Sequence, residues 1–184
     1  MKPTDDLVNE HKVISHVLEA AADEASRVSK TSEIIPERME QFLDFFRGFA
    51  DKCHHSKEEN HLFPLLEKKG MPHDSGPIAV MLMEHTDGRR RLSNIADLLP
   101  AARNNDKSAI KSIEENLSAY IALLQAHIEK ENKVLFPMAD RILSDNDQKD
   151  LEEAFEIVEK IETGEGVHEK YHQLAHKITA SLNS

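Results

Sequence analysis

The sequence predicts an all-α protein, an antiparallel up-and-down four-helix bundle with additional helices at its C-terminal end. Glycine (6) and proline (7) are scarce among the 184 residues, which leaves few turn-formers for the many short strands of an all-β fold. Apolar residues recur at spacings of three and four, the period of an amphipathic helix. Four such stretches joined by short polar connections are typical of an antiparallel bundle.

The first helix is expected over about residues 4–29. Thr4, Asp5 or Asp6 can cap its N-terminus. Its apolar face carries Leu7, His11, Ile14, Leu18, Ala21, Ala25 and Val28. One histidine, His11, therefore lies on the side that is expected to face the core.

The second helix is expected to begin near Pro36, a residue suited to the first helical turn. It runs to about Lys69, before the helix-stopping sequence Gly-Met-Pro at 70–72. The first half of this helix buries Met39, Phe42, Leu43, Phe46, Phe49, Ala50 and Cys53.

Two further long helices complete the predicted bundle. The third follows a cap at Asp74 or Ser75 and ends at Pro100, with an apolar side made of Ile78, Met81, Leu82, His85, Leu92, Ile95 and Leu99. The fourth begins after Asp106 and continues to about Met138. Its core positions are Ile113, Leu117, Tyr120, Leu124, His127, Glu131, Val134 and Met138.

The remaining chain predicts a separate unit packed on the bundle. The bundle is assigned to residues 1–143 and the helical extension to 144–184. The extension holds an amphipathic helix at about 147–162 and a final helix at about 167–182, joined by a Gly-Glu-Gly hinge at 164–166.

Composition excludes several classes of partner. The formal net charge is −11, which argues against nucleic acid and anionic membranes because both require clustered positive charge. The sequence shows no signal-peptide pattern and no apolar run long enough to span a membrane. A single cysteine, Cys53, fits a reducing compartment. A cytoplasmic location is expected, and the sequence does not identify a protein partner.

A short motif occurs twice: a histidine, a glutamate four residues later, and then the sequence Leu-Phe-Pro. The two copies are His54, Glu58 and residues 62–64 on the second helix, and His127, Glu131 and residues 135–137 on the fourth. Residues four apart leave the same face of a helix. Each copy therefore directs one imidazole and one carboxylate toward a shared interior.

The other two helices each place a histidine on their apolar face, within the pairs Glu10-His11 and Glu84-His85. Burying four imidazoles and two carboxylates without partners would cost several kcal/mol each, as much in total as the stability of a domain. A pair of metal ions satisfies them, because carboxylates can bridge two cations while imidazoles occupy outer positions. The ligand set is compatible with iron, manganese or zinc.

These residues resemble those of the hemerythrin-like, HHE cation-binding family, over about residues 4–140. That family has a four-helix bundle around a non-haem di-iron centre, often bridged by an oxo or hydroxo oxygen. By this likeness, His11 and His54 would bind one iron ion and His85 and His127 the other. Glu58 and Glu131 would bridge the two ions.

The sequence departs from the family's oxygen carriers at one position. They place two ligand histidines one turn apart on the third helix, whereas here the residue one turn before His85 is Met81. A fifth imidazole must then come from elsewhere or be replaced by water. We expect the final helix to fold over an open end of the bundle so that His168, or less favourably His172, completes one iron.

Other chemically active side chains are interpreted without a direct metal role. At about 100° per residue, His55 points away from the apolar side of its helix, so His55 and Glu59 are taken to face solvent or to support a ligand from outside. The remainder are His16 and His73 at the surface, His61 at the surface or supporting a ligand, Cys53 and Tyr120 as packing residues, and residues 89–91 (three arginines) as a solvated face.

The resemblance leaves three classes of function open. The favoured one is a module that binds or senses dioxygen, nitric oxide or peroxide at the His/Glu-bridged metal centre. The first alternative is a di-iron enzyme that consumes peroxide or repairs nitrosatively damaged iron centres. The second is a structural role, in which metal merely holds the helices together.

Overall fold

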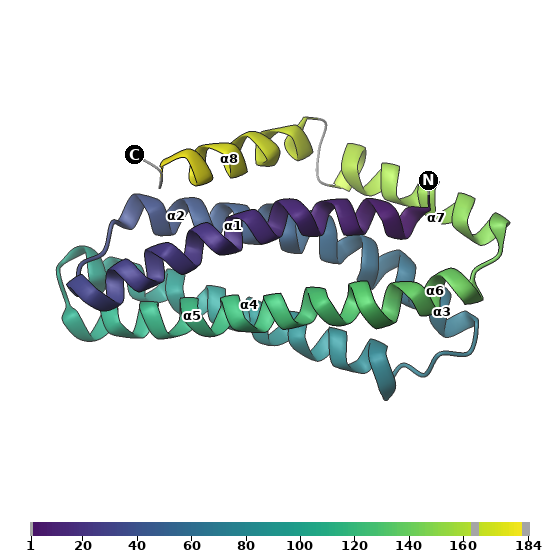
Figure 1. The fold of residues 1–184 in the computed structure, drawn as a ribbon, viewed down its shortest axis with the longest axis horizontal. Coiled ribbons are helices and arrows are strands. Elements are labelled where there is room, and N and C mark those ends of the chain that lie inside the picture. Colours follow the sequence, from purple (N-terminus) through teal and green to yellow (C-terminus); the bar gives the residue numbers. More distant parts are fainter. Residues whose placement is uncertain (1, 163–165, 182–184) are drawn as a thin grey trace.

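The computed structural model describes residues 2–162 and 166–181, without the side chains of residues 161, 162, 168 and 181. All regular structure in this part of the chain is helical, as predicted (Figure 1). The elements, with η marking π-helical segments, are α1 (Pro3–Thr31), α2 (Pro36–Phe45), η1 (Phe46–His55), η2 (Glu58–Leu62), α3 (Phe63–Lys68), α4 (Gly76–Arg103), α5 (Lys107–Lys130), η3 (Glu131–Leu135), α6 (Phe136–Ile142), α7 (Asp145–Ile157), η4 (Val158–Glu162) and α8 (Val167–Ser181).

Most helix ends follow the predicted positions, and two predictions about them are wrong. Helix α1 begins at Pro3 with Lys2 at the N-cap position, so none of Thr4, Asp5 and Asp6 occupies that position. Thr4 lies buried in the first turn, where its hydroxyl donates to Asp140 at 2.7 Å. Pro100 does not end α4, which continues to Arg103. A proline removes only its own backbone donor, so residues after it can keep helical geometry.

The predicted second and fourth helices each contain π-helical turns directly before their Leu-Phe-Pro sequence. The Phe63 N–H bonds to the Glu58 carbonyl and the Phe136 N–H to the Glu131 carbonyl, each reaching five residues back. The next residue is a proline, which lacks an N–H and whose ring displaces the carbonyl four residues earlier. The repeated proline thus accounts for a widened turn beginning at each motif glutamate.

The long helices run roughly along one axis, with α5 packed along α1 and α4 (Figure 1). Their interior forms two apolar clusters. One is built around Phe46 and Leu117 and the other around Phe63 and Phe136. Along each long helix the histidines and glutamates of the repeated motifs fall between members of the two clusters, so the polar group interrupts a single apolar interior.

The C-terminal helices lie against the rest of the protein. Helix α8 packs on α1 and α2, and Tyr171 reaches Asp44, to which its hydroxyl donates at 3.1 Å. Helix α7 contributes Leu151 and Phe155 to the apolar cluster around Phe63. Within the described residues, no helix combines the length and the apolar character that crossing a bilayer would require.

Candidate metal centre

Six side chains predicted as metal ligands meet in the interior. Each is at most 2% exposed, and they come from every long helical segment: His11 from α1, His54 from η1, Glu58 from η2, His85 from α4, His127 from α5 and Glu131 from η3. The sequence pattern located them because each lies on the apolar face of its helix. Their convergence satisfies the central expectation of the repeated motif.

The histidines are arranged in two pairs. The Nε2 atoms of His11 and His54 are 2.9 Å apart, and those of His85 and His127 are 3.1 Å apart. Two nitrogens bound at about 2.1 Å to one ion, at a right angle, would lie about 3 Å apart. The spacing within each pair therefore suits a shared cation.

Acceptors outside the pairs orient every one of these rings. His54 Nδ1–H donates to Glu10 at 2.8 Å, and His127 Nδ1–H donates to Glu84 at 2.9 Å. The same contact is made by His11 to the amide oxygen of Asn132 at 2.8 Å and by His85 to Glu59 at 2.6 Å. An acceptor at Nδ1 turns the Nε2 lone pair inward, as is usual for metal-binding imidazoles.

The two carboxylates connect the pairs. Glu131 Oε2 lies 3.2 Å from the Nε2 atoms of both His127 and His11. Glu58 lies between the other two rings, with Oε1 3.8 Å from His54 Nε2 and Oε2 3.5 Å from His85 Nε2. Each glutamate thus reaches one histidine of each pair, the position of a bridging ligand between two ions.

The donor set fits metal ions better than it fits a hydrogen-bonded core. All four carboxylate oxygens of Glu58 and Glu131 are buried, and no hydrogen-bond partner for them is found in the described part of the chain. Leaving such atoms unsatisfied is costly. Cations at the two histidine pairs would supply the missing partners, and the imidazole and carboxylate ligands suit iron, manganese or zinc.

Without an ion, the two carboxyl groups cannot both carry a charge. Burial and the nearby Glu131 charge raise the pKa of Glu58 well above 4.5. Burial would also raise the pKa of Glu131, but His127 and His11 hold it well below that value. A bound cation removes the repulsion between the two carboxylates.

The histidines respond to the same surroundings. Burial, reinforced by His11, lowers the pKa of His54 to about 4, so this ring is neutral at pH 7. Burial also acts to lower the pKa of His127, yet Glu131 and Glu84 raise it to about 9. His127 must therefore give up a proton before its Nε2 can bind a metal.

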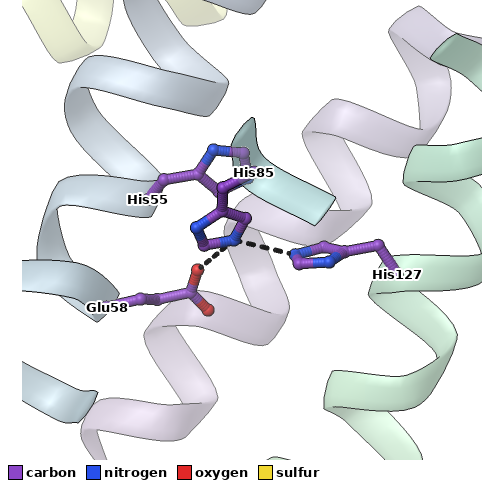
Figure 2. A group of neighbouring side chains, drawn as sticks. All are labelled: His55, Glu58, His85 and His127. Atoms are coloured by element: carbon purple, nitrogen blue, oxygen red, sulfur yellow. Dashed lines mark hydrogen bonds and ion pairs between the residues drawn. The ribbon is translucent and has the colours of Figure 1, made fainter. Parts of the chain in front are cut away.

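The interpretation of His55 as pointing away from the interior is wrong. Its ring is only 6% exposed and stacks on His85 with 3.8 Å between the ring centroids (Figure 2). Both His54 and His55 lie in η1, where the Ser56 N–H bonds to the Asp51 carbonyl five residues back. In a π-helical turn each residue advances by less than about 100°, so two consecutive side chains can both face inward.

Two supporting lysines were not singled out in the sequence. Lys57 is fully buried, and its Nζ donates to Glu10 at 2.6 Å and to Glu159 of η4 at 2.5 Å. Lys130 makes the equivalent bond to Glu84. The signal was present, since both lysines directly precede the motif glutamate.

The predicted extra ligand is not tested by the described residues. The side chain of His168 lies outside them, so its assignment stays a prediction. The alternative, His172, packs edge-on against Phe49 with ring centroids 5.5 Å apart. It belongs to neither of the two clusters whose ligand atoms lie within 4.8 Å of one another, which are His55, Glu58, His85 and His127, and His11, His54, Glu58 and Glu131.

Most other side chains occupy the environments expected for them. Glu59 supports His85 from outside, and His16 and His73 are exposed. Tyr120 and Cys53 are buried, with the Tyr120 ring edge-on to Phe46. His61 is half-buried, and the arginines at 89–91 all pair with acidic side chains.

The chain is similar to several known proteins. An uncharacterised protein of Mycobacterium tuberculosis is 26% identical over 161 residues, which cover 88% of this chain and 62% of that protein. The iron-sulfur cluster repair protein YtfE of Edwardsiella ictaluri is 33% identical over 125 residues, or 67% of this chain and 55% of the relative. The same-named protein of Dickeya chrysanthemi is 33% identical over 90 residues, or 48% of this chain and 41% of its own length.

This chain therefore spans between 41% and 62% of the length of these relatives. No solved structure matches it with comparable significance. The family model for the hemerythrin HHE cation-binding domain matches residues 2–139, a stretch that contains all six converging side chains. Together with the geometry of those side chains, this match shows that the chain belongs to the hemerythrin HHE cation-binding family.

Proposed function

We propose that this protein holds two iron ions and binds a small molecule there: dioxygen, nitric oxide or peroxide. The observation that supports it best is the pair of carboxylates, each reaching one histidine of both pairs. Iron bound there would supply open coordination positions and reversible electron transfer. The chain's own residues orient the ligands, exclude water and neutralise charge.

The proposal includes an arrangement of the chain. Residues 1–143 form an antiparallel four-helix bundle that contains the site, and residues 144–184 cover one side of it. Contacts of α7 with α1 and of α8 with α1 and α2 favour this division. An oxo or hydroxo bridge between the irons is part of the proposal and follows from the family resemblance.

The first test is iron content together with optical spectra of the reduced protein before and after exposure to nitric oxide or dioxygen. Two irons per chain and a ligand-dependent change in absorption are expected. In Glu58→Gln, iron retention should fall at least tenfold, because a bridging oxygen is lost. The matched control is Glu129→Gln, an exposed glutamate near the second motif. Full zinc occupancy of the native protein, without iron, would contradict the proposal.

A second candidate is an enzyme that repairs iron centres or consumes peroxide. It is favoured by the similarity to relatives named iron-sulfur cluster repair proteins. Steady turnover of hydrogen peroxide, or restoration of a damaged iron-sulfur protein, by the iron-loaded chain would support it. Loss of that turnover in Glu58→Gln but not in Glu129→Gln would assign it to this site.

A further inference from the structure

A small cavity adjoins the centre on the side of the His85–His127 pair. Its volume is about 20 Å³, and its lining includes His55, His85, His127, Gly88 and Leu124. A cavity needs about 10–15 Å³ on this measure to hold one water molecule. The space therefore suits a ligand of one or two heavy atoms.

His55 lines this cavity and has one ring nitrogen without a partner among the described residues. Its Nε2 is buried and makes no hydrogen bond within the described part of the chain. Its other nitrogen, Nδ1, lies 3.4 Å from Asp51 Oδ1, and Asp51 also accepts from Arg89 at 2.8 Å. Because a carboxylate can only accept, the ring proton belongs on Nδ1, and Nε2 is left as an acceptor.

His55, Glu58, His85 and His127 each offer a ligand atom, and these atoms lie within 4.8 Å of one another. The stacking of His55 on His85 nevertheless argues against a metal ion shared by these two rings. The two rings are 3.8 Å apart and within 17° of parallel (Figure 2). The lone pair of an imidazole nitrogen lies in the ring plane, and two nearly parallel planes at this separation do not meet within bonding distance of either ring. His55 is thus close to the His85–His127 pair without being its ligand.

Among the described side chains, the His11–His54 half of the centre shows no counterpart of His55. Aligning the two motif copies places Ile128 opposite His55. The ring of His11 is stacked on Phe136 at 5.5 Å, and buried Lys57 lies beside that pair. A small ligand that donates a hydrogen bond therefore finds an acceptor, His55 Nε2, on the His85–His127 side.

We propose that His55 Nε2 accepts a hydrogen bond from a ligand in this cavity and so selects small molecules that carry their own O–H, hydrogen peroxide above all, over diatomics without a proton. The inference rests on the proposed function, since it places the ligand beside the His85–His127 ion. It assigns His55 a positioning role that distinguishes between the candidate ligands.

The test compares two ligands on the iron-loaded protein and its variants. In His55→Leu we expect the apparent affinity for hydrogen peroxide, measured by stopped-flow absorption on the oxidised form, to fall about tenfold, the effect of one hydrogen bond. The affinity of the reduced form for nitric oxide should change by less than about twofold. Iron content should stay at the wild-type level, since His55 is not a ligand.

Two further variants complete the experiment. His55→Gln retains a side-chain oxygen acceptor and should recover part of the peroxide affinity, while His16→Leu, a change at an exposed histidine, should match wild type. Loss of an iron in His55→Leu, or equal losses for peroxide and nitric oxide, would overturn the inference alone. Binding of nitric oxide but not of peroxide by the wild-type protein would also overturn the inference alone. Failure of wild type to hold iron would instead refute the proposed function.

Discussion

Individual carboxylates in this protein are buried in two different ways. Glu58 and Glu131 are buried without conventional partners, which suits a site built for cations. Glu24, by contrast, is fully buried in α1 but is held by Arg27 at 2.6 Å and by Arg38 at 2.8 Å. Unpartnered carboxylates therefore mark the centre, whereas Glu24 ties α1 to α2.

Glu24 gives a prediction about pH. Burial opposes its ionisation, but the hydrogen bonds and charges of Arg27 and Arg38 leave its pKa below 4.5. A carboxyl whose pKa falls on folding stabilises the protein above its unfolded pKa, and this contribution is lost as pH drops through the folded value. Urea unfolding should show Glu24→Gln about 1–3 kcal/mol less stable than wild type at pH 7. The difference should shrink at pH 3, and exposed Glu19→Gln should show no such pattern.

At the scale of elements, the buried side chain of Lys57 connects the C-terminal extension to the metal centre. Glu159 of η4 bonds to Lys57, Lys57 bonds to Glu10, and Glu10 accepts from His54. The second motif copy repeats this chain only as far as Lys130 and Glu84, and Lys130 is 41% exposed. In both halves a glutamate and a lysine lie outside the histidine, but Lys57 is buried against the C-terminal extension whereas Lys130 is partly exposed.

Replacing each lysine by methionine separates these two situations. Lys57→Met leaves two carboxylates without their buried partner and should cost about 3–5 kcal/mol in the free energy of unfolding. Lys130→Met breaks a half-exposed pair and should cost less than about 1 kcal/mol. Denaturant unfolding of both variants checks the contrast. Equal costs would show that the C-terminal extension does not shield Lys57 in solution.

The docking of α8 depends on the lack of a side chain at Gly48. A Cβ added there would lie 1.8 Å from the Tyr171 hydroxyl, so Gly48→Ala must push the Tyr171 ring away. Such overpacking costs about 1–3 kcal/mol. Limited proteolysis should cut near α8 faster in Gly48→Ala, and adding Tyr171→Leu should restore part of the protection. An unchanged cleavage rate in Gly48→Ala would contradict this packing.

The sequence was sufficient for side chains on a regular helical period and insufficient where that period changes. Helix spacing placed His11, His54 and His85 on interior faces because their surroundings are apolar at positions three and four apart. It misplaced His55 because the chain is π-helical there. Lys57 was missed for a different reason. Its buried ammonium group pairs with Glu10 and with Glu159, and Glu159 lies in η4, 102 residues away in the sequence.

For the molecule as a whole, metal binding should be linked to proton release. In the metal-free protein the pKa of His127 is about 9, so its ring is protonated at pH 7 and must lose a proton to bind a metal. The pKa of Glu58 lies well above 4.5, so this carboxyl group also holds its proton more tightly than a free glutamate does. Affinity therefore rises with pH and falls in acid. Calorimetric titration with ferrous iron in buffers of different ionisation enthalpy should show net proton release at pH 7. No dependence on the buffer would contradict the assigned protonation states.

The near-repeat of the centre has one more consequence. Because the two motif copies present matching ligands, the molecule allows a comparison between an ion position beside a small cavity and one beside the Phe136 ring. Any spectroscopic inequivalence of the two ions can be tested against the positions at which the two copies differ, among them Ile128 opposite His55 and Asn132 opposite Glu59. Exchanging those side chains between the copies would show which of them makes the two ion positions unequal.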